Sequence, residues 1–416
     1  MNKKFNLELV AEAYERLKNI IVMTPLELNK GLSERLKAKI YLKREDLQLV
    51  RSYKLRGAYN KMSILGAEER RKGVVCASAG NHAQGFAFGC EKLKMEGTVF
   101  MPRNSPRQKI DRVHSLGKKW IKVELVGDTF DEAYENAKKF SDQKGKIFIH
   151  PFNDPYIVAG QATVGLEILK QIKDPVDYFI VPIGGGGLIS GIGSYIKKFS
   201  PKSKIIGVEP VGAPSMYKSL KKNKIITLDK IEKFVDGVAV KTVGTLTFEL
   251  SKKVIDEIIL IPEGKVCQEM IYLYQTNGII TEPAGALSVA ALDSIAKIIR
   301  GKTVVCIVSG GNNDISRYPE IIERSLIYQG LKHYFIIEFP QRPGALRRYL
   351  DEVLGPNDDI TLFEYVKKNN RENGPALVGI ELSKKENLQH LVSRMNKIGM
   401  IYEILKDNSP IFRFLI

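Results

Sequence analysis

The sequence contains little of what marks secreted, metal-binding or membrane-spanning proteins. Only four cysteines stand among the 416 residues, and none of them forms the C-x-x-C spacing of a zinc or redox motif. No run of about 18 apolar residues is present, which predicts that the chain does not enter a membrane. The amino-terminal segment is typical of an amphipathic helix and lacks a signal-peptide core. These absences predict a cytoplasmic protein with reduced thiols.

Acidic residues are scarce relative to basic ones: 47 Asp and Glu stand against 64 Lys and Arg, for a formal net charge of +17. Such a charge raises the question of a nucleic-acid partner. The lysines are spread along the whole chain without a basic block, which indicates a lysine-rich surface and no nucleic-acid partner. Hydrophobic residues make up 44% of the chain, which excludes a disordered protein.

Short apolar runs alternate with helical patterns as far as about residue 325. We predict strands at 74–78, 98–101, 120–126, 147–150, 177–183, 204–209 and 303–309. We predict helices at 81–94, 106–116, 128–142, 157–173, 188–199 and 284–300. This alternation indicates an α/β fold with a mostly parallel sheet covered by helices. Ligands of such sheets bind at the carboxyl ends of the strands.

The pattern changes near residue 330. Strands are predicted at 332–339, 360–368, 375–382 and 402–405, and helices at 343–354 and 386–399. The order strand–helix–strand–strand–helix–strand is that of a ferredoxin-like unit. We therefore predict a catalytic α/β body over 1–325, with a smaller subdomain at about 44–150, followed by a small α+β module over 331–416.

Four consecutive glycines, Gly184 to Gly187, join the predicted strand at 177–183 to the predicted helix at 188–199. Without side chains, backbone N–H groups can converge on an anion, and the helix N-terminus adds a positive dipole end. No Lys-Ser/Thr pair follows, which excludes a Walker loop, and no G-x-G-x-x-G precedes an acidic residue, which disfavours a dinucleotide site. The remaining interpretations are a site for one phosphate monoester and a tight strand–helix turn.

Two further strand ends carry small and polar residues. From the last residue of the predicted strand at 74–78 onward, the chain reads Ser78, Ala79, Gly80, Asn81 and His82. These residues suit either a carboxylate held by free N–H groups or a simple helix cap. The predicted strand at 303–309 ends with Ser309 and is followed by Gly310, Gly311 and Asn312; Ser309 could equally be a ligand or a turn residue.

Lys54 stands in "RSYKLRGAYN", residues 51–60, at the start of a predicted helix. A helix N-terminus disfavours a positive charge and so favours the neutral amine that forms an imine. An imine-forming lysine together with a glycine-rich phosphate loop would make a pyridoxal phosphate site. A solvated surface cation is the alternative for Lys54 taken alone.

The pattern as a whole resembles a known family. The motifs are "RSYKLRGAYN" (51–60), "SAGNHAQG" (78–85), "HPFND" (150–154), "VPIGGGGL" (181–188), "TEPAGA" (281–286) and "SGGNND" (309–314). In this order they resemble the fold type II pyridoxal-phosphate enzymes and, more narrowly, the threonine dehydratases. The resemblance implies a tryptophan synthase β-like body of two subdomains, with pyridoxal 5'-phosphate as cofactor.

The resemblance also implies a role for each matching residue. Lys54 would bond the cofactor and move the α-proton of the substrate. Asn81 would hydrogen-bond the phenolic oxygen of the cofactor, and Ser309 would face its pyridine nitrogen. The other implied cofactor-binding residues are Tyr53, where relatives more often have Phe, and Gly184, Gly185, Gly186, Gly187, Leu188, Gly237 and Glu282. The implied substrate pocket comprises Ser78, Ala79, Gly80, Asn81, His82, Phe152, Asn153 and Asp236.

Three positions bear on the type of reaction. A serine at 309 can leave the pyridine nitrogen neutral, which suits β-elimination of L-threonine to 2-oxobutanoate and ammonia. Serine racemases of this fold carry a serine where this chain has Ala79, so the resemblance favours elimination. Some relatives bind a divalent metal through an acidic pair; here Glu209 is present but Ser215 replaces the second acid, and we predict no metal. A serine dehydratase, a serine racemase and a non-catalytic amino-acid sensor remain as alternatives.

The segment "FIIEFPQRPGALRRYLDEVL", residues 335–354, resembles the ACT-like regulatory module of biosynthetic threonine dehydratases, in a single copy. The resemblance implies an amino-acid effector, isoleucine with valine opposing it, and a place in isoleucine biosynthesis. It also implies a homo-oligomer, a tetramer or a dimer. A module that only stabilises the oligomer is the alternative.

Overall fold

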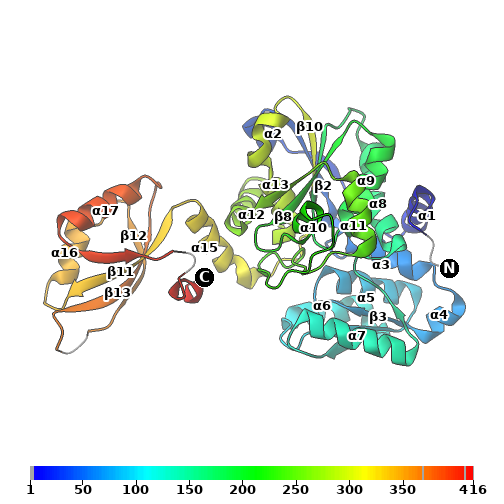
Figure 1. The fold of residues 1–416 in the computed structure, drawn as a ribbon, viewed down its shortest axis with the longest axis horizontal. Coiled ribbons are helices and arrows are strands. Elements are labelled where there is room, and N and C mark those ends of the chain that lie inside the picture. The colour runs from blue at the N-terminus through cyan, green and yellow to red at the C-terminus, as the bar shows by residue number, and fades with distance from the viewer. Residues whose placement is uncertain (1–3, 368–369, 407–408, 416) are drawn as a thin grey trace. The chain divides into compact units, whose positions relative to one another are not determined.

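The computed structural model describes residues 4–367, 370–406 and 409–415 of the chain. They form two compact units (Figure 1): the first comprises residues 1–263 and 272–313, and the second comprises 264–271 and 314–416. The last residue of the predicted strand at 360–368 and the last residue of the predicted module lie outside the described residues. The predicted domain boundaries themselves stay predictions.

A six-stranded sheet forms the larger half of the first unit. Its order is β1 (Leu26–Leu28), β2 (Lys39–Arg44), β10 (Thr303–Val308), β7 (Tyr178–Pro182), β8 (Lys204–Pro210) and β9 (Glu257–Ile261). Every pair is parallel except β1 with β2. The helices of this half are α1 (Leu7–Leu17), α2 (Lys30–Leu36), α8 (Pro155–Gln171), α9 (Gly187–Phe199), α10 (Ser215–Lys221), α11 (Thr245–Val254), α13 (Pro283–Ala290) and α14 (Ala296–Ile299). A core of Val, Ile, Leu and Phe side chains lies between the sheet and its helices.

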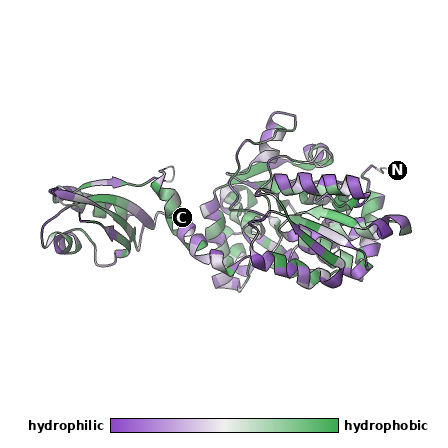
Figure 2. Cartoon of the chain, turned by 90° about the horizontal axis from the view of Figure 1, so that it is seen from below, coloured by the Kyte–Doolittle hydropathy of each residue, from purple (hydrophilic) through white to green (hydrophobic). Residues whose placement is uncertain are grey.

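A four-stranded parallel sheet forms the smaller half of the first unit. Its order is β5 (Ile121–Leu125), β4 (Gly97–Met101), β3 (Val74–Ala77) and β6 (Ile147–Phe148). Its helices are α3 (Lys54–Ser63), α4 (Ala67–Lys72), α5 (Asn81–Leu93), α6 (Arg107–Gly117) and α7 (Phe130–Lys144). Two apolar clusters fill the space between this sheet and its helices. Figure 2 shows the strands of the first unit mostly in hydrophobic colours and the outer helix faces mostly in hydrophilic ones.

The second unit contains an antiparallel sheet in the order β12 (Asp359–Tyr365), β13 (Asn373–Glu381), β11 (Lys332–Pro340) and β14 (Ile401–Ile404). Helices α16 (Ala345–Glu352) and α17 (Asn387–Lys397) pack with this sheet around one apolar core. Helix α15 (Tyr318–Tyr328) precedes β11, and α12 (Glu263–Asn277) contributes residues to both units. The element order confirms the predicted ferredoxin-like unit.

The predicted α/β class is confirmed, and each predicted strand forms. Sequence patterns missed β1, β2 and β9, and the predicted helix at 284–300 is divided into α13, a short 3₁₀ segment and α14. Strand β2 escaped prediction because the sequence "KIYLKR" carries basic residues, of which Lys43 is fully buried and paired with Glu167. Among the described residues no helix is long and apolar enough to cross a membrane.

Candidate active site

Helices α3, α5 and α9 of the first unit begin at predicted site residues, and α13 begins directly after Glu282; none of the four has a hydrogen bond from a side chain at its N-cap. Asn6 caps α1 and Asp154 caps α8 through their side chains, whereas α6, α10 and α11 also lack a side-chain cap. The first N–H groups of a helix have no acceptor within the helix. The uncapped N-termini therefore leave backbone donors and a positive dipole end for a ligand.

Lys54 occupies the first position of α3, and its amine donates to the backbone carbonyl of Pro151 at 3.1 Å. The segment before it is docked on the loop after β10, because Tyr53 N–H donates to Ser309 O at 3.2 Å and Gly311 N–H donates to Arg51 O at 2.9 Å. The side chain of Lys54 keeps some solvent contact, but burial lowers the pKa of its amine to about 8, against an opposing effect of Glu282. Much of this amine is therefore neutral near pH 8.

The glycine loop between β7 and α9 has no room for side chains. A Cβ on Gly184 would lie 2.9 Å from the Cα of Val238, and one on Gly185 would lie 2.3 Å from the ring of Phe152. Gly186 has a φ of +91°, in the left-handed region that other residues avoid. The loop is thus confined to bare backbone directly before the uncapped start of α9, which is the arrangement that suits a phosphate.

Asn81, Glu282 and Asn312 form one hydrogen-bonded group beside these loops. Asn81 Nδ2 donates to Glu282 Oε1 at 2.7 Å, and Asn312 Nδ2 donates to Asn81 Oδ1 at 2.7 Å. Burial, with a smaller contribution from Asp236, raises the pKa of the Glu282 carboxyl to about 7. Ser309 is buried and its hydroxyl donates to the carbonyl of Ala284 at 3.2 Å. The structure therefore brings the predicted cofactor residues of four separate segments together.

The side chains of the predicted substrate pocket are less free than the sequence suggests. His82 is buried against Ile149 O at 2.9 Å, and burial lowers its pKa to about 3. The amide of Asn153 is turned to the start of α11, where its Oδ1 accepts from Leu246 N–H at 2.9 Å. Asp236 pairs with Lys109 at 2.8 Å. Ser78 accepts from Gly80 N–H at 3.1 Å within its own loop, next to Ala79.

Gly237 and Glu209 complete the predicted set. A Cβ on Gly237 would lie 2.8 Å from Ala284 Cβ and 3.4 Å from Glu282 Oε1, which places this glycine at the same group of residues. Leu188, in the first turn of α9, is buried.

The Glu209 carboxylate accepts the N–H groups of Met216 and Tyr217 at 2.8 Å each. Within the described residues no group of three or more His, Cys, Asp or Glu could hold a metal.

Three contributors were missed by the sequence analysis. Pro151 stands within the motif "HPFND", but the motif assigned no role to its carbonyl, and Lys109 has no recognisable signal because lysines are common in this chain. Asn312 does stand within the motif "SGGNND", but the motif alone assigned it no role. Its contact with Asn81 appears only once the fold is known.

Comparison with known proteins identifies the family. The model of the pyridoxal-phosphate dependent enzymes matches residues 17–310, and the model of the C-terminal regulatory domain of threonine dehydratase matches residues 323–415. The chain belongs to the pyridoxal-phosphate dependent enzyme family. It is 54% identical to the biosynthetic L-threonine dehydratase IlvA of Halalkalibacterium halodurans, over 99% of this chain and all of that protein. It is 53% identical to the IlvA of Bacillus subtilis, over 100% of this chain and 98% of that protein.

Solved structures agree on the fold. The processed form of threonine deaminase isoform 2 from Solanum lycopersicum is 39% identical, with a TM-score of 0.73 over 78% of this chain and 96% of that chain. Serine racemase from Dictyostelium discoideum is 33% identical, with a TM-score of 0.69 over 75% of this chain and 99% of that chain. A deaminase and a racemase thus share this fold, so the fold alone does not decide between the two reactions.

The residues present fit pyridoxal phosphate, the cofactor that the family implies. The crowded glycine loop supplies backbone donors for a phosphate, and Lys54 supplies an amine with a lowered pKa. The Ser309 hydroxyl stands at the end of β10, in the same hydrogen-bonded set of loops as Lys54. These are the three kinds of contact that the phosphate, the aldehyde and the ring nitrogen of this cofactor require.

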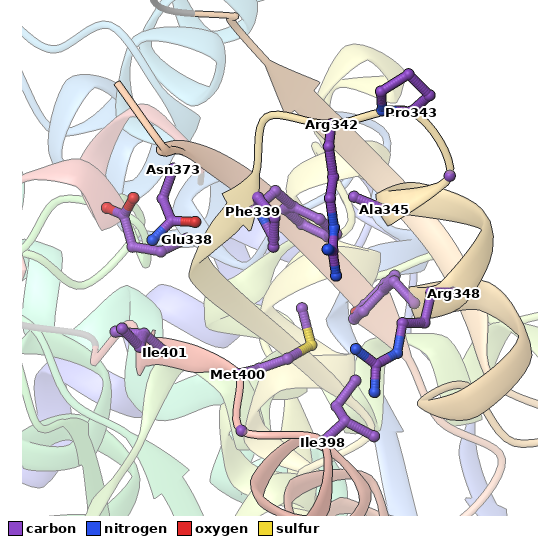
Figure 3. Close-up of a pocket in the computed structure, with 14 residues that line it drawn as sticks. Glu338, Phe339, Arg342, Pro343, Ala345, Arg348, Asn373, Ile398, Met400 and Ile401 are labelled. Atoms are coloured by element: carbon purple, nitrogen blue, oxygen red, sulfur yellow. The ribbon is translucent and has the colours of Figure 1, made fainter. Parts of the chain in front are cut away.

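The second unit holds a pocket of about 410 Å³ between the β11–α16 loop, the start of β13 and the residues before β14 (Figure 3). We name it the regulatory pocket; its lining includes Glu338, Arg342, Arg348, Tyr349, Ile398 and Met400. Arg342 and Arg348 extend toward the same space, beside Met400 and Ile398 (Figure 3). The hydroxyl of Tyr349 is buried and has no hydrogen-bond partner among the described residues.

Proposed function

We propose that the chain is a cytoplasmic, pyridoxal-phosphate-dependent ammonia-lyase that converts L-threonine to 2-oxobutanoate and ammonia, the first step of isoleucine biosynthesis. The observation that carries the proposal is the amine of Lys54, lowered in pKa and set among the glycine loop, Asn81 and Ser309. The names of the full-length relatives support the choice of threonine as substrate.

Each residue of the site has a distinct task in this proposal. Lys54 holds the cofactor and then takes the α-proton of the bound amino acid. The N–H groups of the glycine loop and of Leu188 hold the phosphate, and Asn81 donates to the phenolic oxygen. Pyridoxal phosphate supplies an electron sink for the electrons of the broken Cα–H bond. Ser309 offers a neutral partner to the ring nitrogen, so that proton removal and loss of the β-hydroxyl stay closely linked.

Individual residues distinguish threonine dehydration from the alternative functions. Racemisation requires a proton donor on the second face of the α-carbon, and Ala79 has no ionisable group for that task. A serine dehydratase differs from a threonine dehydratase by one methyl group in the pocket, which is worth only about 1–3 kcal/mol. A non-catalytic sensor has no need of an amine whose pKa is lowered to about 8.

The substrate test uses the full chain loaded with pyridoxal phosphate. We expect a visible absorbance band, 2-oxobutanoate from L-threonine, and slower turnover of L-serine. Lys54→Ala should lose the band and lower turnover by on the order of 10³-fold. Lys61→Ala, on the same helix and paired with Asp154, is the matched control and should keep both. A band without 2-oxo acid from either substrate would exclude the lyase.

The pKa of Lys54 gives a second test, on the cofactor-free protein. Only the neutral amine attacks the aldehyde, so the rate of cofactor capture should rise with pH and level off above the folded pKa of about 8. An ordinary exposed lysine would level off near its usual value of about 10.4. Stopped-flow absorbance between pH 6 and pH 11 would separate the two, and a midpoint near 10.4 would contradict the burial of this amine.

The proposal includes feedback control through the second unit. We propose an amino-acid effector, isoleucine with valine opposing it, bound in the regulatory pocket of a homo-oligomer, a dimer or a tetramer. Two guanidinium groups suit the carboxylate of an amino acid, and Ile398 and Met400 suit an aliphatic side chain. Among the described residues Arg342 makes no ion pair and the Tyr349 hydroxyl has no hydrogen-bond partner, so both groups are available to a ligand.

A further inference from the structure

Asn312 lies at the centre of a continuous chain of hydrogen bonds in the candidate active site. Its Nδ2 donates to the carbonyl of Val50 at 2.8 Å and to Oδ1 of Asn81 at 2.7 Å. Asn81 in turn donates from Nδ2 to Oε1 of Glu282 at 2.7 Å. The backbone N–H of Asn312 also donates to the Glu282 carboxylate. Asn312 therefore touches both of the polar side chains that flank the proposed cofactor site.

The direction of these hydrogen bonds is determined at the Val50 end. A backbone carbonyl such as that of Val50 only accepts, so the side chain of Asn312 must present its NH₂ group there. The second N–H of that group then donates to Asn81, so the amide of Asn81 must present its oxygen there. The NH₂ group of Asn81 is left facing Glu282, whose Oε1 accepts its hydrogen bond. Asn81 thus has one amide orientation, although its two ends are nearly equal in shape.

We propose that Asn312 is a positioning residue that holds the NH₂ group of Asn81, and not its carbonyl, toward the phenolic oxygen of the cofactor. The inference rests on the proposed function, in which Asn81 binds that oxygen. If Asn312 could not donate, the amide of Asn81 could turn over. Its carbonyl would then face another acceptor oxygen, and the hydrogen bond to the cofactor would be lost.

The loop that carries Asn312 is itself held in place. Gly311 N–H donates to Arg51 O at 2.9 Å, and a Cβ on Gly311 would lie 2.8 Å from the carbonyl of Ile280. Val50, the other acceptor of Asn312, stands four residues before Lys54 in the segment that opens α3. The same side chain therefore ties Asn81 to the segment that positions Lys54.

The test follows the pH dependence of the visible band of the loaded, full-length protein. In Asn312→Asp the side chain can only accept, so Asn81 must turn its NH₂ group away from the cofactor. An oxygen that has lost a donor holds its proton more tightly. The midpoint of the pH titration should therefore rise by about one unit, the equivalent of one hydrogen bond to a charged group. Asn312→Ala should raise it less, because the amide of Asn81 becomes free to adopt either orientation.

Asn313→Asp is the matched control for the added charge. It makes the same chemical change one residue along, at a side chain whose two polar atoms have no hydrogen-bond partner among the described residues. Its titration midpoint should stay within a few tenths of a unit of the wild-type value. An equal rise in Asn313→Asp and Asn312→Asp would show that charge alone causes the shift, and would overturn the proposal.

A double variant separates positioning from a general structural role. If Asn312 acts through Asn81, then adding Asn312→Ala to Asn81→Ala should shift the midpoint no further. Additive shifts would overturn the proposal, as would an unchanged midpoint in both Asn312 variants. Asn312→Ala introduces no charge, so it carries the test if Asn312→Asp does not fold. A wild-type protein without a Lys54-dependent band would instead remove the proposed function, and the role of Asn312 with it.

Discussion

Lys54 and Tyr349 each carry a polar group into a proposed ligand site, but only one of the two groups has a partner in the described protein. The amine of Lys54 donates to Pro151 O, and the residues around it are joined by hydrogen bonds. The hydroxyl of Tyr349 is buried without a partner. A buried unsatisfied group costs about 1–3 kcal/mol. The first site is thus held together before a ligand arrives, whereas the regulatory pocket leaves a group that a ligand would satisfy.

This difference matches the tasks proposed for the two sites. Proton transfer requires groups held in a narrow geometry. A regulatory site requires instead that one state of the protein bind the ligand better than another. An unsatisfied hydroxyl that gains a partner only on binding provides such a difference in free energy.

A buried ion cluster around Arg56, two residues further along α3, supports the helix that carries Lys54. The guanidinium of Arg56 is fully buried and makes five hydrogen bonds, to the carboxylates of Glu45 and Glu167 and to the hydroxyl of Thr163. Lys43 joins the cluster through Glu167 at 2.6 Å. The cluster links β2, α3 and α8, and so fixes the start of the helix that carries Lys54.

The substitution with the largest predicted effect removes the central cation of this cluster. Arg56→Met leaves Glu45 and Glu167 buried without their main cation, and should lower the free energy of unfolding by about 3–5 kcal/mol. Urea unfolding followed by the fluorescence of Trp120, the single tryptophan of the chain, reports on the first unit. Arg107→Met, at a side chain that is 93% exposed, is the control and should change the value by at most about 0.5 kcal/mol. Equal losses in the two variants would contradict the role of the cluster.

Sequence patterns predicted those parts of the first unit that depend on local signals. Apolar runs that end in glycine or serine predicted β3, β7 and β10. The four adjacent glycines predicted the glycine loop, in which the structure leaves no room for side chains. Lys54 was recognised through a motif of its neighbours.

Such patterns could not predict the ion cluster, because the sequence does not show whether a charged residue is buried or exposed. Glu167 stands 111 residues from Arg56, and only the fold brings them to 2.6 Å. For the same reason Asn153 was predicted in the substrate pocket, while its amide is turned to α11. The direction of a side chain is determined by its neighbours in space, which one sequence does not contain.

A pair of glycines extends the comparison to the backbone of the two sites. Gly185→Ala places a methyl group 2.3 Å from the ring of Phe152, so the loop or the ring must move. Overpacking of this kind costs about 1–3 kcal/mol, and we expect cofactor affinity to fall by about 10- to 100-fold. Gly344 has a φ of +87° but open space around it, so Gly344→Ala should strain only the second unit. Fluorescence titration with pyridoxal phosphate measures the cofactor affinity of both variants. An unchanged affinity in Gly185→Ala would contradict the assignment of this loop to the phosphate.

The smallest predicted effect concerns stability at the regulatory pocket. Tyr349→Phe removes a hydroxyl that has no partner among the described residues, so the free energy of unfolding of the second unit should stay the same or rise by up to about 1 kcal/mol. Tyr334→Phe is the matched control in the same unit, because the Tyr334 hydroxyl donates to Glu323 at 2.6 Å, and its loss should cost about 1 kcal/mol.

The response to isoleucine should follow the opposite order in these two variants. Tyr349→Phe deletes a group that we assign to the ligand, so the isoleucine concentration needed for half the change in activity should rise by about tenfold. Tyr334→Phe should leave that concentration within about twofold of the wild-type value, because its hydroxyl already serves Glu323. If Tyr349→Phe lost stability and kept its response, the hydroxyl would have a partner within the protein. The contrast between the partnered amine of Lys54 and the hydroxyl of Tyr349, which lacks a partner among the described residues, would then no longer hold.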